Sequence, residues 1–121
     1  MITAGIFGAS GYSGLELVRL LSRHPEVALR FATSDRFAGT RCEALLPGLG
    51  SPLSFVGHDE GIALGCDLAF LATPPEASRE LALKLSASSR VVDLSNAFRA
   101  DDTSAEAMCD ELVDLMYRNV R

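Results

Sequence analysis

Three glycines near the start of the chain have the spacing of a loop that binds an anion. Gly8, Gly11 and Gly14 stand between the apolar run 2–7 and the helical pattern of residues 13–24. In such a loop the first glycine permits a sharp turn, the second lets the backbone approach a pyrophosphate, and the third lets helix and strand pack closely. The unpartnered N–H groups of the first helical turn attract negative charge. The pattern predicts dinucleotide binding; glycines that serve only turn geometry are the alternative.

Position 11 is the most informative of the three. A side chain there would block the approach of the backbone to a ligand, and valine would also resist the positive φ that we expect at this glycine. Substitution of Gly11 therefore best distinguishes the two hypotheses, a loop that binds a dinucleotide and a turn that is purely structural.

The end of the second expected strand, Val27 to Ala32, bears on which dinucleotide is bound. An acid at this point selects NAD by accepting a hydrogen bond from the ribose 2′-hydroxyl. This chain instead has Ser34 and Arg36, a hydroxyl and a guanidinium that suit the 2′-phosphate of NADP. Asp35 leaves NAD open, because NAD would be preferred if Asp35 rather than Ser34 faced the ribose.

Two further strands should end at the same edge of the sheet. The strand Cys66 to Ala72 is followed by Thr73, which we expect to cap a helix together with Glu76 and which opens a helix reaching Ser86. The strand Arg90 to Leu94 is followed by residues 95–99. Because ligands of such sheets bind at the carboxyl ends of the strands, Arg99 is well placed for an anion.

No residue stands out as a nucleophile or a metal ligand. The three cysteines, Cys42, Cys66 and Cys109, form no C-x-x-C pattern and no cluster with histidine, so the sequence predicts neither a disulfide framework nor a zinc site. The run His58-Asp59-Glu60 is expected to be a polar turn whose side chains diverge. We therefore assign no catalytic residue and no metal.

Composition excludes several classes of function. The net charge is −5, which disfavours nucleic-acid binding, and no apolar run approaches the roughly 20 residues of a membrane span. Residues 1–100 hold ten acids and nine bases, whereas residues 101–121 hold six acids and two arginines. Without a basic, apolar leader the chain is expected to be cytoplasmic.

The order of elements predicts an α/β fold. We expect a Rossmann-like, doubly wound parallel sheet of order 3-2-1-4-5, forming a single domain with a C-terminal helix. Residues 37–52 are expected to be a loop holding a short helix at 41–46, and residues 53–56 a short strand. Residues 1–100 would be the dinucleotide-binding domain and residues 101–121 an acidic, amphipathic helix.

Four segments, in order and spacing, resemble one known family: GIFGASGYSGLELVRLL, TSDRFAG, DLAFLATPPEAS and VVDLSNAFR. They are similar to the N-terminal NADP-binding domain of N-acetyl-gamma-glutamyl-phosphate reductase, and the last is shared with the related aspartate-semialdehyde dehydrogenases. The resemblance covers residues 1 to about 100. It implies NADPH-dependent reduction of an acyl phosphate to a semialdehyde in arginine biosynthesis, with a cysteine as nucleophile and a histidine as acid and base.

The resemblance also implies roles for individual positions. The pyrophosphate would lie on Gly8, Ser10, Gly11, Tyr12, Ser13 and Gly14, and the 2′-phosphate on Ser34 and Arg36. Ala72, Thr73 and Pro74 would line the path to the nicotinamide, Ser95 would approach it, and Arg99 would approach the substrate phosphate.

The chain departs from the family where the chemistry occurs. It has no Asn-Pro-Gly-Cys segment and no histidine-bearing catalytic domain, and Pro74-Pro75 stands where the family often has Pro-His. The partners that we expect are a dinucleotide and a catalytic domain or second chain. The alternatives are an aspartate-semialdehyde-dehydrogenase-like domain, a stand-alone dinucleotide-binding redox sensor, and a non-binding remnant that forms a homo-oligomer through its last helix.

Overall fold

A computed structural model describes residues 1–95, which form a five-stranded parallel sheet of order β3-β2-β1-β4-β5. The strands are β1 (Ile2–Phe7), β2 (Val27–Thr33), β3 (Phe55–Val56), β4 (Leu68–Leu71) and β5 (Arg90–Asp93). The helices are α1 (Tyr12–Leu21), α2 (Cys42–Leu45), α3 (His58–Leu64) and α4 (Pro75–Leu85). The predicted Rossmann-like fold and strand order are confirmed. The expected helix at 101–121 lies outside the described residues, as does Arg99.

The core lies in two layers, one on each face of the sheet. On one face, Ile6 of β1 and Phe70 of β4 pack in the same cluster as Val18 of α1. On the other face, Phe7 and Phe31 pack in a cluster with Leu81 of α4, and their rings meet edge to face at 5.4 Å between centroids. Alternation along the strands sends successive side chains to opposite faces, so near-continuous apolar runs such as that of β4 are buried on both.

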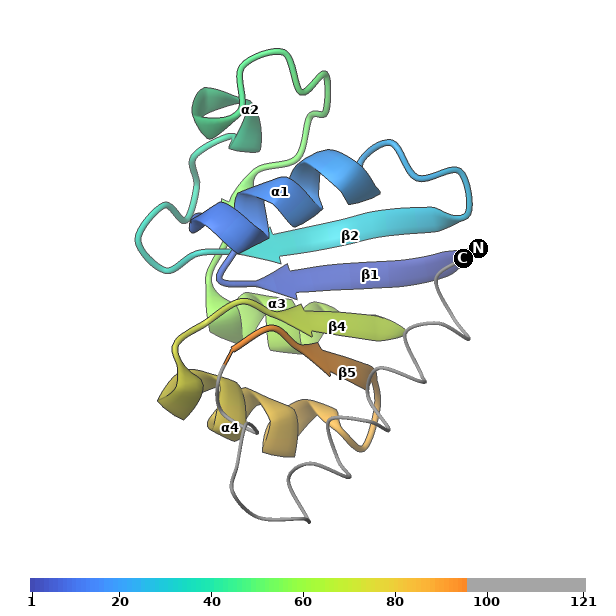
Figure 1. Ribbon diagram of the computed structural model, residues 1–121, viewed down its shortest axis with the longest axis vertical. Coiled ribbons are helices and arrows are strands. Elements are labelled where there is room, and N and C mark those ends of the chain that lie inside the picture. Colours follow the sequence, from blue (N-terminus) through green and yellow to red (C-terminus); the bar gives the residue numbers. More distant parts are fainter. Residues whose placement is uncertain (96–121) are drawn as a thin grey trace.

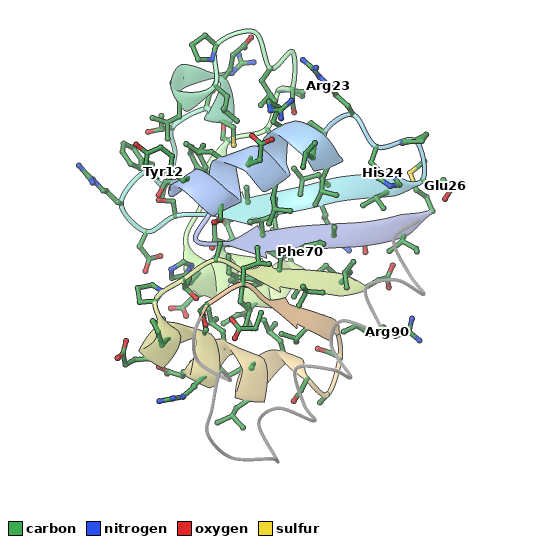
Figure 2. All side chains as sticks on the ribbon, in the orientation of Figure 1. Tyr12, Arg23, His24, Glu26, Phe70 and Arg90 are labelled. Atoms are coloured by element: carbon green, nitrogen blue, oxygen red, sulfur yellow. The ribbon has the colours of Figure 1, made fainter. Side chains whose placement is uncertain are left out.

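All strands point the same way, so their carboxyl ends share one edge (Figure 1). The turn into α1, the loop after β2, the start of α3 and the turn into α4 all begin at this edge. In Figure 2 Tyr12 lies at this edge, whereas Arg23, His24 and Glu26 lie at the opposite, amino edge. A dinucleotide-binding fold presents its ligand site at the carboxyl edge.

Two local expectations were wrong. Residues 58–60, expected to be a turn, are the first turn of α3, whose first N–H group is bound by the Asp35 carboxylate (His58 N to Asp35 Oδ1, 2.9 Å). Thr73 does not cap α4: Pro74 is the N-cap residue, and the buried Thr73 hydroxyl lies 2.7 Å from that of Ser78 instead. Proline fits this extended position, because its fixed φ suits the residues that begin a helix.

Candidate functional site

The three glycines of the loop differ in their surroundings. Gly8 has φ +79°, and a Cβ there would lie 2.7 Å from the Ala72 carbonyl oxygen. A Cβ on Gly14 would lie 2.4 Å from the Gly8 carbonyl oxygen. Around Gly11 nothing lies within 4 Å of such an atom. The fold itself therefore requires Gly8 and Gly14, whereas the space beside Gly11 is left open at the edge where ligands bind.

The backbone of Gly11 corrects one expectation and leaves the other standing. Its φ is −83° and its ψ 176°, so the expected positive φ is wrong, and the position is sterically accessible to any residue. Internal geometry therefore gives no reason for glycine here. The expectation that a ligand approaches this backbone closely stays a prediction.

The N–H groups of this loop fall into two sets. Those of Gly8 and Ala9 are bound within the protein, at 3.3 Å to the Thr33 hydroxyl and at 2.8 Å to the Thr33 carbonyl oxygen. Those that begin α1 receive no side-chain cap, and Gly11, Tyr12 and Ser13 are exposed, with Tyr12 99% exposed. Unpaired N–H groups at the positive end of a ten-residue helix can hold an anion.

Residues after β2 point in three different directions. Ser34 is buried, and its hydroxyl donates to Ser10 Oγ (3.0 Å) and accepts from the Phe37 N–H (3.2 Å). Asp35 turns to the start of α3, where it binds the His58 N–H. The exposed Arg36 guanidinium lies 5.1 Å from the centre of the Phe37 ring. Ser34 thus joins Thr33 in linking the end of β2 to the glycine loop.

The carboxyl end of β4 adjoins the same loop. The Ala72 N–H donates to the Phe7 carbonyl oxygen (2.8 Å), and Thr73 packs beside Gly8, whereas Pro74 is exposed. At the end of β5 the Ser95 N–H and hydroxyl both donate to Asp93 Oδ1, at 2.9 and 2.6 Å. The structure therefore brings residues 72–73 to the glycine loop and leaves Ser95 engaged with its own strand.

Neither described cysteine has the character of a nucleophile. Burial raises the pKa of the Cys42 thiol to about 11 and also raises that of Cys66. A thiol is reactive as its thiolate, which these shifts suppress near neutral pH. Among residues 1–95 no cluster of histidine, cysteine or acidic side chains could hold a metal ion.

We expect iodoacetamide at about pH 8 to leave Cys42 and Cys66 unmodified in the native protein, because an ordinary thiol has a pKa near 8.5 and theirs lie higher. Peptide mapping by mass spectrometry before and after unfolding in guanidinium measures this. Modification of the native Cys42 peptide as fast as the unfolded one would contradict the burial described here.

Two cavities of the described residues lie away from the glycine loop. One of about 510 Å³ opens at the amino edge, beside Ile2, Asp67 and residues 86–90. Another of about 180 Å³ lies between α3 and α4, beside His58 and Lys84. Neither cavity is lined by a residue of the glycine loop.

Comparison with known proteins agrees with this geometry. Residues 3–117 match the family described as "Semialdehyde dehydrogenase, NAD binding domain". The chain belongs to this family. The resemblance that residues 1–100 suggested is thereby confirmed, and the domain is a dinucleotide-binding one.

Curated relatives include the N-acetyl-gamma-glutamyl-phosphate reductases of Laribacter hongkongensis, 46% identical over 105 residues, and of Thiobacillus denitrificans, 39% identical over 124 residues. These matches cover 84% and 94% of this chain but 31% and 36% of the relatives, so the chain spans about a third of their length. A solved structure of aspartate semialdehyde dehydrogenase with NADP, from Candida albicans, is 25% identical to this chain and superposes with a TM-score of 0.69. The match covers 84% of this chain and 31% of that one. In the described residues no helix has the length and apolar character needed to cross a membrane.

The contact between Thr33 and His58, beside the glycine loop, is one that the sequence did not reveal. Thr33 is the last residue of β2, one position beyond the expected strand, and His58 lies in the segment expected to be a turn. Their side chains lie 2.6 Å apart, and Thr33 binds the glycine loop. The signal lies in the pairing of β2 with β1, which sets Thr33 opposite Phe7.

Proposed function

We propose that this domain binds NADP(H) on the loop between β1 and α1, and that it is the cofactor-binding part of an acyl-phosphate reductase. The observation that carries the proposal is Gly11, an exposed glycine with an ordinary φ and open space beside it, at the positive end of α1. If the turn used its glycines only for geometry, the fold should require glycine at position 11, as it does at Gly8 and Gly14.

The residues after β2 support NADP over NAD. The Asp35 carboxylate, the one acid here that could accept from a 2′-hydroxyl, is engaged at α3 (Asp35 Oδ1 to His58 N, 2.9 Å). Ser34 directs its hydroxyl to Ser10, whose own hydroxyl proton then remains for a phosphate oxygen. Arg36 supplies the charge that a 2′-phosphate needs. These contacts support the proposal of a phosphorylated ribose beside the glycine loop.

The substrate side of the proposal rests on the relatives. Bound NADPH supplies hydride; this domain holds the dinucleotide, and residues outside the described chain hold the acyl group. Relatives named N-acetyl-gamma-glutamyl-phosphate reductase are 39–46% identical, against 23–29% for the aspartate semialdehyde dehydrogenase structures. This favours the former substrate class, and with it arginine biosynthesis. By this proposal Cys42 and Cys66 do not serve as the nucleophile, and a second unit supplies it.

Replacing Arg36 by alanine is expected to weaken NADPH binding by about 1.5–3 kcal/mol, the range for hydrogen bonds to charged groups, or roughly 10- to 150-fold. NADH, which lacks the 2′-phosphate, should change little. Isothermal titration of both cofactors against parent and variant measures the difference.

Arg23→Ala is the matched control, since it removes the same exposed charge at the opposite edge of the sheet (Figure 2). It should leave both affinities unchanged. Equal losses of NADPH and NADH in the Arg36 variant would remove Arg36 from the 2′-phosphate role, and a parent that binds neither cofactor would refute the proposed function.

A further inference from the structure

One residue of β2 holds the beginning of the glycine loop through both its main chain and its side chain. Thr33 is fully buried; its carbonyl oxygen accepts the Ala9 N–H at 2.8 Å and its hydroxyl accepts the Gly8 N–H at 3.3 Å. The two N–H groups of the loop nearest to β1 are therefore already hydrogen-bonded within the protein. The next N–H groups, which start α1, are left to face outward.

The Thr33 hydroxyl is itself held from the other face of the sheet. His58, the first residue of α3, places Nδ1 2.6 Å from Thr33 Oγ1. A hydroxyl that accepts the Gly8 N–H still has one proton to donate, and Nδ1 is in place to accept it. The other ring nitrogen, Nε2, faces Asp35 Oδ2 at 3.9 Å.

The imidazole ring has little freedom to leave this position. Its backbone N–H is bound by Asp35, and its ring packs near Phe7, with 6.2 Å between ring centres. The side chain is only 27% exposed. An Asp–His–hydroxyl series is also found in nucleophilic sites, but Thr33 is fully buried and its oxygen already accepts a loop N–H, so no substrate reaches it.

We propose that Thr33 and His58 are positioning residues for the pyrophosphate, because they fix the curvature of the glycine loop from beneath and so aim the N–H groups of residues 11–13. The inference rests on the proposed function and deepens it. It makes the start of α3, on the face of the sheet opposite α1, part of the cofactor site. When a buried hydrogen bond loses one partner, the other partner is left unsatisfied. Removing either side chain should therefore disturb the loop as well as the Thr33–His58 contact itself.

Paired substitutions at each position test this. Thr33→Ser keeps the hydroxyl and Thr33→Val replaces it with a methyl group of similar size. His58→Asn keeps an acceptor near the place of Nδ1, and His58→Leu removes it. We expect Thr33→Val and His58→Leu to weaken NADPH binding about tenfold or more, and their conservative partners to stay within about threefold of the parent.

A second ligand separates positioning from general damage. 2′-AMP carries the 2′-phosphate but no pyrophosphate, so its affinity, measured by NMR titration, should be equal in all five proteins. Loss of NADPH affinity with 2′-AMP retained is the expected result. Equal loss of both ligands, or NADPH affinity within about twofold of the parent in both Thr33→Val and His58→Leu, overturns the inference. Because the His58 side chain is partly exposed, its two variants should fold even if Thr33→Val does not. A parent protein that binds no NADPH overturns both this inference and the proposed function.

Discussion

Replacing Gly11 by valine is expected to abolish NADPH binding while the domain stays folded. Valine can adopt the backbone angles of Gly11, and its Cβ meets no protein atom within 4 Å. Its branched side chain would instead occupy the space beside the N–H groups that begin α1. If two or more hydrogen bonds to a charged pyrophosphate are lost, at about 1.5–3 kcal/mol each, affinity should fall more than about 100-fold.

The folded state should lose little. Gly11 is the N-cap residue of α1, a position where valine is less favourable than glycine by about 1 kcal/mol, which lowers the unfolding temperature by roughly 4–8 °C. Thermal unfolding and NADPH titration on the same sample measure both effects, and 2′-AMP binding serves as the control. Retained NADPH affinity would mean that the loop is a structural turn.

What the sequence allowed us to predict depends on local patterns and on the order of the elements. The run 2–7, the glycine turn and the helix after it are contiguous, so their strand–turn–helix order could be read from apolar spacing and glycine positions. The pairing of β1 with β4 could be predicted from the order of the elements and the handedness of their connections. The open space beside Gly11 agrees with the ligand role that its place in the motif suggested.

What could not be predicted depends on residues far apart in the chain. Gly61 lies in the interior of α3 and lowers its intrinsic helix propensity. The helix forms because Asp35, 23 residues earlier, binds its first N–H, and because Gly61 allows it to lie against the sheet, where a Cβ would come within 2.5 Å of Thr33. The Thr33–His58 pair exists only because of that packing.

The wrong expectation for Thr73 has a similar cause. The pattern Thr73-x-x-Glu76 is typical of a capping box, which satisfies N–H groups with side chains close in sequence. In the fold Thr73 is buried beside Gly8, and its hydroxyl pairs with the buried Ser78. A buried hydroxyl needs a partner of its own, so packing decided its role over the local motif.

Replacing Gly14 by alanine or valine is expected to destabilise the domain severely, in contrast to Gly11. Gly14 is the third residue of α1, and helix propensity alone would predict that alanine gains about 1 kcal/mol there. The structure predicts the opposite. A Cβ would lie 2.4 Å from the Gly8 carbonyl oxygen and 2.6 Å from Ala9 Cα, and these are backbone atoms of the turn, which no side-chain rotation can move aside.

Helix and loop must therefore separate to admit even one methyl group, in a core where Ala9 and Val18 are fully buried. Overpacking a well-packed interior costs about 1–3 kcal/mol and occasionally more, and a clash with backbone belongs at the upper end. We expect Gly14→Ala to lose about 3 kcal/mol in the free energy of unfolding, measured by urea denaturation, and Gly14→Val to lose more. Gly39→Ala, at an exposed glycine with φ +90° and open surroundings, is the control for strain of the backbone without a clash, and it should cost roughly 1–2 kcal/mol. A Gly14→Ala variant as stable as the parent would show that α1 and the loop pack less closely than described. The argument that Gly11, unlike Gly14, is a glycine because of a ligand would then be weakened.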